Sequence, residues 1–276
     1  MVKGGDMKKP NKNFSIINID KPSGPTSFTV SDFVRHKLGL KKTSHFGTLD
    51  PKVTGVLPVA LGRACRLTGF FLGHDKTYIG ILHTHKKQEM REVQEIINKN
   101  FVGKIKQLPP IRSRVKRAIR EREVKKWELL EAGEDGRNFV FIAKVEGGTY
   151  IRKLCSDLGE KIGGAHMLEL RRIKAGIFSE ENSVNLYDFE KAVDENKLGE
   201  ISIPAEGAIK KIMPVVQVKK GALKELLTGK PLFKKDVVGN LAKEDVFAVF
   251  CGGVFVEIAR KFKQKDIVGK PLFVFN

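Results

Sequence analysis

Cysteine is scarce in this chain, and its placement argues against several classes of protein. The three cysteines, Cys65, Cys155 and Cys251, lie far apart, and no pair has the CxxC spacing of a zinc or redox motif. This pattern disfavours a disulfide framework or zinc site and fits a reducing compartment. His83 and His85 stand two apart on a predicted strand beside a lysine pair, which favours a surface role over metal ligation. We therefore expect no metal site.

Long apolar runs are also missing. No uninterrupted run approaches the ~20 residues that a membrane-spanning helix needs. The first residues, MVKGGDMKKPNKN, contain no apolar core of a signal peptide. The hydrophobic content of 41% is nevertheless that of an ordinary globular protein, which argues against disorder. We expect an intracellular, cytoplasmic protein with no membrane partner.

Acidic residues are few relative to basic ones. The chain has 51 Lys and Arg against 32 Asp and Glu, which gives a net charge of +19. Such an excess favours a polyanionic partner, because cations displace counterions from a phosphate backbone. An acidic membrane surface is the competing partner, and a solvated basic surface without a partner is the plainest alternative.

The basic charge is concentrated in residues 112–126, RSRVKRAIREREVKK. This stretch contains eight Lys or Arg and two acids, and apolar residues are interleaved with the cations. The pattern is typical of a surface element that faces an anion. The candidate nucleic-acid contacts are Arg112, Arg114, Lys116, Arg117 and Arg120.

Strand and helix patterns alternate irregularly along the chain. That irregularity predicts an α+β fold with a largely antiparallel central sheet and flanking helices, because a parallel sheet would need a regular βαβ order. Strands are predicted at 14–19, 56–61, 76–85, 127–132, 139–147 and 167–178. Helices are predicted from Ser27, as the capping residue, to Leu38, at 91–101, from about 150 to Gly163, and at 186–193. We expect three parts: a flexible basic tail at 1–13, a first domain at 14–205, and a small β-rich domain at 206–276.

One turn, HFGTLDPKVTGV (45–56), has two competing interpretations. An aspartate before proline, such as Asp50, most often accepts local backbone N–H groups in a turn. However, Gly47 and Gly55 allow the backbone to bend sharply or to approach a ligand closely. Asp50 is therefore a candidate catalytic carboxylate as well as a candidate turn residue.

Two further side chains have alternative interpretations. Arg152 is either one of many solvated cations or the partner that keeps an active-site carboxylate ionised. Tyr78 is one of three tyrosines. It is either a core residue or an aromatic platform on which an extruded base stacks.

Several blocks occur here in the order found in the TruB/dyskerin pseudouridine synthases, and the chain resembles that family over about residues 14–190. The blocks are NIDKPSGPTSF (18–28), HFGTLDPKVTGVLPVALGRACRL (45–67), KTY (76–78), LPPIRSRVKR (108–117) and GGTYIRKLCSDLG…AHMLELRRIKAG (147–176). The segments PKVTG, RKLCSDLG and AHMLELRR are similar to the sequences of the archaeal and eukaryal box H/ACA branch of this family.

The resemblance implies a pseudouridine synthase fold and a set of residue roles. Asp50 matches the catalytic aspartate, Arg152 its arginine partner, and Tyr78 the tyrosine that stacks on the flipped uridine. The remaining matches are Leu154, which lines the pocket; His45, which contacts the extruded nucleotide; and Lys21 with Pro22, which support the pocket from beneath. Neither a metal nor an organic cofactor is implied. Phe46 departs from the pattern, because the family usually has a small residue there.

The resemblance also implies function and partners. It predicts an enzyme that isomerises uridine in RNA, guided by a box H/ACA RNA to modify rRNA and assembled with the small H/ACA proteins. The final segment resembles an RNA-binding PUA domain. A stand-alone enzyme acting on the T-arm of tRNA is the nearest alternative, and a non-catalytic RNA-binding scaffold is the third.

Overall fold

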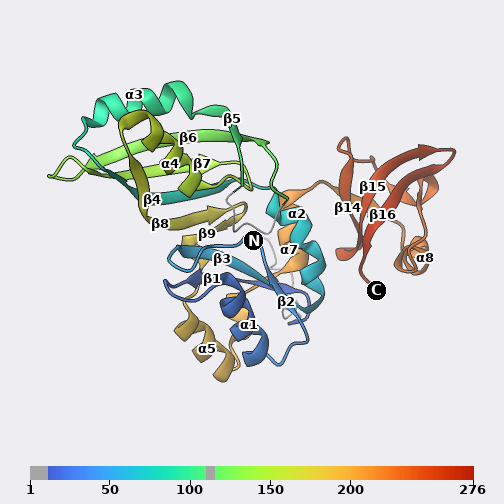
Figure 1. The fold of residues 1–276 in the computed structure, drawn as a ribbon. Coiled ribbons are helices and arrows are strands. Elements are labelled where there is room, and N and C mark those ends of the chain that lie inside the picture. Colours follow the sequence, from blue (N-terminus) through green and yellow to red (C-terminus); the bar gives the residue numbers. More distant parts are fainter. Residues whose placement is uncertain (1–11, 110–115) are drawn as a thin grey trace, which may run out of the picture. The chain divides into compact units, whose positions relative to one another are not determined.

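The computed structural model describes residues 12–109 and 116–276 and divides into two compact units, with the boundary between Ser202 and Ile203. Within the described residues, the first unit is built on a ten-stranded sheet (Figure 1). The order along the sheet is β10–β1–β3–β8–β4–β7–β6–β5, with β2 paired to β3 and β9 paired to β8. These strands are β1 (Ser15–Lys21), β2 (Thr43–His45), β3 (Thr54–Leu61), β4 (Lys76–Thr84), β5 (Gly103–Gln107), β6 (Arg120–Ala132), β7 (Asn138–Val145), β8 (Ala165–Ala175), β9 (Phe178–Ser179) and β10 (Ser202–Pro204).

The pairing of the strands is mostly antiparallel. The exception among the long strands is the parallel contact of β3 with β8, where Gly55 is the register partner of Arg172. The predicted α+β class with a largely antiparallel sheet is confirmed. The parallel contact brings the N-terminal part of the unit against the strand that follows α4 (Ile151–Ile162), and the candidate site lies at this contact.

Helices cover the sheet in two groups. In Figure 1, α3 (Met90–Asn100) and α4 lie beside β6 and β8, whereas α1 (Ser27–Lys37) and α5 (Leu186–Asp194) lie beside β3 and β1. Shorter helices are α2 (Thr68–Leu72) and α6 (Leu198–Ile201). Within the described part of the chain, no helix has both the length and the apolar character needed to cross a membrane.

The sequence of α4 shows why this segment is helical and which face it buries. Leu154, Leu158 and Ile162 recur every four residues and are all buried in the core of the unit. The helix ends as predicted at Gly163, whose φ of 82° is the left-handed conformation that glycine adopts without strain.

The start of α1 differs from the prediction. Thr26, not Ser27, is the N-cap, and its hydroxyl accepts the backbone N–H of Thr29 at 3.0 Å. Ser27 is fully buried and bonds instead to the backbone of Leu49, which lies 22 residues further along the chain. Because the Ser27 hydroxyl bonds to a distant residue, it cannot also cap the helix, and the neighbouring sequence does not reveal this.

The second unit is a small β-rich fold with its own apolar core, as predicted. It contains a six-stranded sheet in the order β12–β16–β15–β14–β11–β13. Its elements are α7 (Ala205–Ile212), β11 (Val215–Val218), α8 (Leu223–Leu227), β12 (Leu232–Phe233), β13 (Val237–Val238), β14 (Val246–Cys251), β15 (Val254–Gln264) and β16 (Ile267–Val274).

Candidate active site

Asp50 stands on a turn between β2 and β3 whose backbone path requires glycine at two positions. Gly47 has a φ of 103° and Gly55 a φ of 99°, both in the region that residues with a Cβ rarely adopt. A Cβ at Gly55 would also lie 2.2 Å from the backbone oxygen of Arg172. The two glycines therefore let the turn pass against β8 while the Asp50 side chain remains half-exposed.

Lys21 supports this turn from within the protein. Its ammonium group is fully buried and donates to three backbone carbonyls, those of Pro22 at 2.8 Å, Pro51 at 2.9 Å and Val53 at 2.9 Å. Burial lowers the pKa of Lys21 from its ordinary value. Because Pro51 and Val53 flank the turn, the lysine fixes the backbone on the C-terminal side of Asp50.

Ser27 holds the other side of the turn. Its hydroxyl accepts the Leu49 N–H at 2.7 Å and donates to the Leu49 carbonyl at 2.9 Å. Both bonds are buried, so a slip of the turn would leave polar groups without partners at a cost of about 1–3 kcal/mol each. Asp50 thus lies between two backbone anchors.

Arg152 forms an ion pair with Asp50 through Nη2 and Oδ2. It lies in the first turn of α4, and the side chains of Arg152 and Asp50 are 56% and 50% exposed. The pair is therefore open to solvent on one side rather than enclosed in an apolar pocket. A guanidinium in contact with a carboxylate favours the ionised form of the acid.

Tyr78 and Leu154 are both buried in the first unit. Tyr78 lies on β4 and is 8% exposed, and Leu154 lies on α4 and is 1% exposed; both belong to the same apolar core. The register partner of Tyr78 on β8 is Arg172, and the Arg172 guanidinium interacts with the tyrosine side chain.

Arg172 connects these parts and was not anticipated from the sequence. It is 1% exposed, and it donates from Nε to the Val56 carbonyl at 2.8 Å and from Nη2 to the Gly47 carbonyl at 2.9 Å. Burial lowers the pKa of Arg172, and Tyr78 opposes that shift. An arginine remains charged under such conditions, so a buried cation lies between the Asp50 turn and Tyr78.

A second buried cation, Lys76, lies next to Arg172. Its ammonium group donates to the carbonyls of Leu72 at 2.5 Å and His74 at 2.6 Å. Burial, and then the charge of Arg172, lower the pKa of Lys76 to about 8.

Phe46 packs away from Asp50 into a cluster of three aromatic rings. Its ring is stacked on Phe71 of α2, with centroids 4.6 Å apart and planes inclined by 2°, and lies 5.9 Å from Phe178 of β9. All three rings are at most 4% exposed. The residue that departs from the family pattern is therefore a buried anchor of the turn.

His45 is the last residue of β2 and is held by two hydroxyls. Its Nδ1 lies 3.4 Å from Ser31 Oγ and its Nε2 lies 3.2 Å from Thr48 Oγ1. The imidazole therefore lies where the turn begins, five residues before Asp50 in the sequence. Pro22 is exposed, and its part in the site is the carbonyl that accepts from Lys21.

The basic run lies partly beyond the residues that can be described. Arg112 and Arg114 fall outside them. Lys116 and Arg117 are exposed, and Arg120 begins β6 with its side chain half-buried.

The histidines show no metal centre. Among residues 12–109 and 116–276, no group of three or more His, Cys, Asp or Glu side chains is arranged to hold a metal ion. His85 is exposed, and His83 is half-buried with Nδ1 2.8 Å from Asn138 Oδ1.

Comparison with known proteins defines the class of this protein. Residues 35–151 match the TruB family pseudouridylate synthase N-terminal domain, and residues 152–210 match the tRNA pseudouridylate synthase B C-terminal domain. The class is therefore that of the pseudouridine synthases, RNA isomerases. The chain belongs to the TruB family.

Archaeal relatives support this assignment. A probable tRNA pseudouridine synthase B of Methanothermobacter thermautotrophicus is 39% identical over 248 residues, which cover 86% of this chain and 75% of that protein. A probable tRNA pseudouridine synthase B of Methanopyrus kandleri is 39% identical over 246 residues, covering 85% and 72%.

Two solved structures are similar over nearly the whole chain. A chain of a Cbf5–Nop10–Gar1 complex has a TM-score of 0.87 and 33% identity, covering 99% of this chain and 91% of that one. A chain of an H/ACA RNP bound to a substrate RNA containing 2′-deoxyuridine has a TM-score of 0.84 and 32% identity, covering 96% and 86%.

Proposed function

We propose that this enzyme is the catalytic subunit of a box H/ACA particle, in which a guide RNA selects the uridines of rRNA that it isomerises. The observation that carries the proposal is the similarity of 99% of this chain, second unit included, to a protein crystallised with Nop10 and Gar1. The expected partners are a guide RNA, the rRNA substrate and small H/ACA proteins of the Nop10 and Gar1 type.

In this proposal Asp50 is the catalytic carboxylate. It attacks the uridine, or assists, while the N-glycosidic bond breaks. The base then rotates and is rejoined to the ribose through carbon. The proton on that carbon is released, and the ring nitrogen that left the ribose takes up a proton. A carboxylate acts as a nucleophile only when ionised. The Arg152 ion pair holds it in that form.

The other residues prepare the site for a base taken out of its stack. Extrusion of a base costs a few kcal/mol. Stacking on the Tyr78 ring returns about 1–3 kcal/mol of this. Leu154 supplies the apolar floor, His45 contacts the extruded nucleotide, and Lys21 and Pro22 hold the turn from beneath. The half-exposed Asp50–Arg152 pair then becomes covered when the uracil enters.

Outside the active site, we propose two surfaces for RNA. One is the basic run containing Arg112, Arg114, Lys116, Arg117 and Arg120. The other is the second unit, acting as a PUA-type module that binds the guide RNA. We place the enzyme in the cytoplasm, in keeping with three cysteines that are all free.

A stand-alone enzyme for the T-arm of tRNA is the second candidate. The archaeal relatives are described as probable tRNA pseudouridine synthase B, which favours a tRNA substrate, and the proposed pocket is equally suited to either RNA.

One experiment separates these functions. Transcripts carrying uridine tritiated at carbon 5 release tritium when the base is isomerised. We expect release from rRNA when guide RNA and partner proteins are added, and much slower release from bare tRNA. Rapid release from bare tRNA with none from guided rRNA would overturn the guided role and support the T-arm enzyme.

A further inference from the structure

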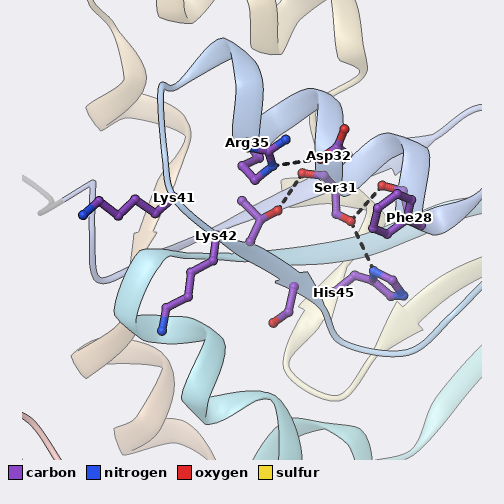
Figure 2. A pocket seen from close by; sticks show the side chains of 9 residues that line it. Phe28, Ser31, Asp32, Arg35, Lys41, Lys42 and His45 are labelled. Carbon is purple, nitrogen blue, oxygen red and sulfur yellow. Dashed lines mark hydrogen bonds and ion pairs between the residues drawn. The ribbon is translucent and has the colours of Figure 1, made fainter.

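A cavity of about 430 Å³ lies beside the candidate active site, between α1 and β2 (Figure 2). It has the size of sites that bind small ligands or single groups of larger ones. Its wall includes Phe28, Ser31, Arg35, Lys41, Lys42 and His45. Because His45 precedes the Asp50 turn, an RNA strand that delivers a uridine to Asp50 passes close to this cavity.

One end of the cavity is aromatic. Figure 2 shows the rings of Phe28 and His45 at the same end, and Phe28 is 66% exposed although it is a large apolar residue. Both ring nitrogens of His45 are engaged by Ser31 and Thr48, so a ligand meets this imidazole through its face. A nucleobase is the ligand group that offers a matching flat face.

The opposite end is cationic. Figure 2 shows Lys41 and Lys42 there, and both side chains are exposed. Arg35 is already paired with Asp32 at 2.8 Å, so it neutralises the acid in the wall. The two lysines are left to attract an anion, and every nucleotide within an RNA strand carries a phosphate on its ribose.

The remaining hydroxyls of the wall bond to the protein. Thr43 donates to the Ser31 carbonyl at 2.8 Å, and Ser44 lies 2.6 Å from the Thr68 hydroxyl. A base placed here would therefore be bound by stacking and by its phosphate, with little reading of its edge.

We propose that this cavity binds one unpaired nucleotide of the substrate strand adjacent to the target uridine, with its base against Phe28, next to the His45 that contacts the extruded uridine, and its phosphate at Lys41 and Lys42. The proposal rests on the assignment of Asp50 as the reaction centre. It gives the substrate a second point of attachment, which fixes the direction from which the target uridine enters. The nucleotide bound here is selected by position and by stacking strength, not by sequence.

The test pairs a protein change with an RNA change. Substrates carry a single abasic nucleotide at each position from three before to three after the target, and each is bound to wild-type protein and to Phe28→Ala in the guided complex. At one position we expect the abasic substitution to weaken binding to wild type roughly tenfold. At that position the abasic substitution should weaken the RNA binding of Phe28→Ala little further. At every other position the losses of affinity from the two changes should multiply. Multiplication at all positions would overturn the proposal.

Two controls complete the design. Tyr187→Ala removes a 74% exposed aromatic side chain of α5, outside the cavity, and should show no coupling with any abasic position. Lys41→Gln with Lys42→Gln should lower the slope of log affinity against log salt by about 0.7 for each phosphate that is no longer neutralised. A neutral methylphosphonate at the bound nucleotide should remove that difference, and an unchanged slope would place its phosphate elsewhere.

The same assay distinguishes a failure of this proposal from a failure of the guided function. Suppose that wild type releases tritium from guided rRNA, while the effects of the abasic substitution and of Phe28→Ala on affinity multiply at all positions. In that case only the cavity assignment is wrong. If wild type converts bare tRNA instead, the function is wrong, and the abasic series is then repeated on the tRNA arm, where coupling at one position would still support the cavity.

Discussion

Phe46 stacks face to face on Phe71 with ring centroids 4.6 Å apart, and this stacking ties the Asp50 turn to α2. Stacked aromatic pairs contribute about 0.5–1.5 kcal/mol beyond the burial of their area. The stack therefore anchors the N-terminal side of the turn, one residue before Gly47.

Removing this ring should loosen the turn and slow the reaction more than it weakens binding. We expect Phe46→Ala to destabilise the first unit by about 3–5 kcal/mol and Phe46→Leu by about 1 kcal/mol. Single-turnover rates measured on folded protein should fall for Phe46→Ala and recover largely in Phe46→Leu, with RNA affinity nearly constant. The matched control is Phe189→Leu, a fully buried ring on α5. If both leucine variants slow the reaction equally, Phe46 has no special role in positioning the turn.

Arg172 should affect the rate of the reaction as well as the stability of the protein. Arg172→Met would leave the Gly47 and Val56 carbonyls without their donor and would take a cation from beside Tyr78. We expect a loss of several kcal/mol of stability, because each buried unpaired group costs about 1–3 kcal/mol. We also expect a slower single-turnover rate, because the carbonyls of Gly47 and Val56 next to the Asp50 turn lose the side chain that holds them.

Arg171→Met is the control for that experiment. Arg171 precedes Arg172 on β8 but forms partly exposed ion pairs with Asp20 and Glu180. It should lower stability by about 1 kcal/mol or less. It should leave the single-turnover rate nearly unchanged, and an equal loss of rate in both variants would show that Arg172 has no special role in positioning the turn.

The sequence was informative wherever local chemistry determines the structure. The turn around Asp50, the glycine at the end of α4 and the alternating pattern of β4 follow from backbone preferences and burial, which neighbouring residues specify. Family motifs then placed Asp50, Arg152 and Tyr78 in one site, and the structure brings Asp50 into contact with Arg152.

The sequence was uninformative where a side chain acts far along the chain. Arg172 is one of 51 basic residues, and its burial depends on carbonyls more than 100 positions away. Ser27 has the local pattern of a cap, yet its partner is Leu49. The function of Phe46 required the positions of Phe71 and Phe178, which no spacing rule provides.

Asp50→Asn should abolish isomerisation and leave RNA binding nearly intact. The amide is the same size but is neutral and cannot serve as a nucleophile. Tritium release measures turnover, and filter binding of the same transcript measures affinity. Asp20→Asn, which changes a carboxylate paired with Arg171, is the comparison. A large loss of affinity in Asp50→Asn would indicate that the carboxylate is structural.

The basic run should contribute to RNA binding through charge alone. Changing Lys116 and Arg117 to Gln should reduce the slope of log affinity against log salt by about 0.7–0.9 for each phosphate that the variant fails to neutralise. Lys104→Gln is the control, because Lys104 is exposed but already paired with Glu121 at 3.1 Å. An equal change of slope in both variants would show that the basic run contacts RNA no more than Lys104 does.

Glu257 should make the second unit less stable as the pH rises. Its side chain is fully buried, and within the described residues neither carboxyl oxygen has a hydrogen-bond partner. Burial raises the pKa of Glu257 from 4.5 to about 8. The folded state therefore holds a proton that the unfolded state releases between these two values, so the free energy of unfolding is highest below pH 4.5 and falls until about pH 8.

The loss across that window is on the order of 5 kcal/mol, from 1.36 kcal/mol per unit of pKa. Glu257→Gln keeps the shape and removes the proton equilibrium, so it should flatten the dependence and raise stability at pH 8 and above. Calorimetric unfolding of the full chain at several pH values measures this, because calorimetry detects the unfolding of the second unit without a fluorescent tryptophan. Glu244→Gln, at an exposed position, should leave the pH dependence as it is. If Glu257→Gln retains the slope of the wild type, the carboxyl is ionised in the folded protein and must be hydrated.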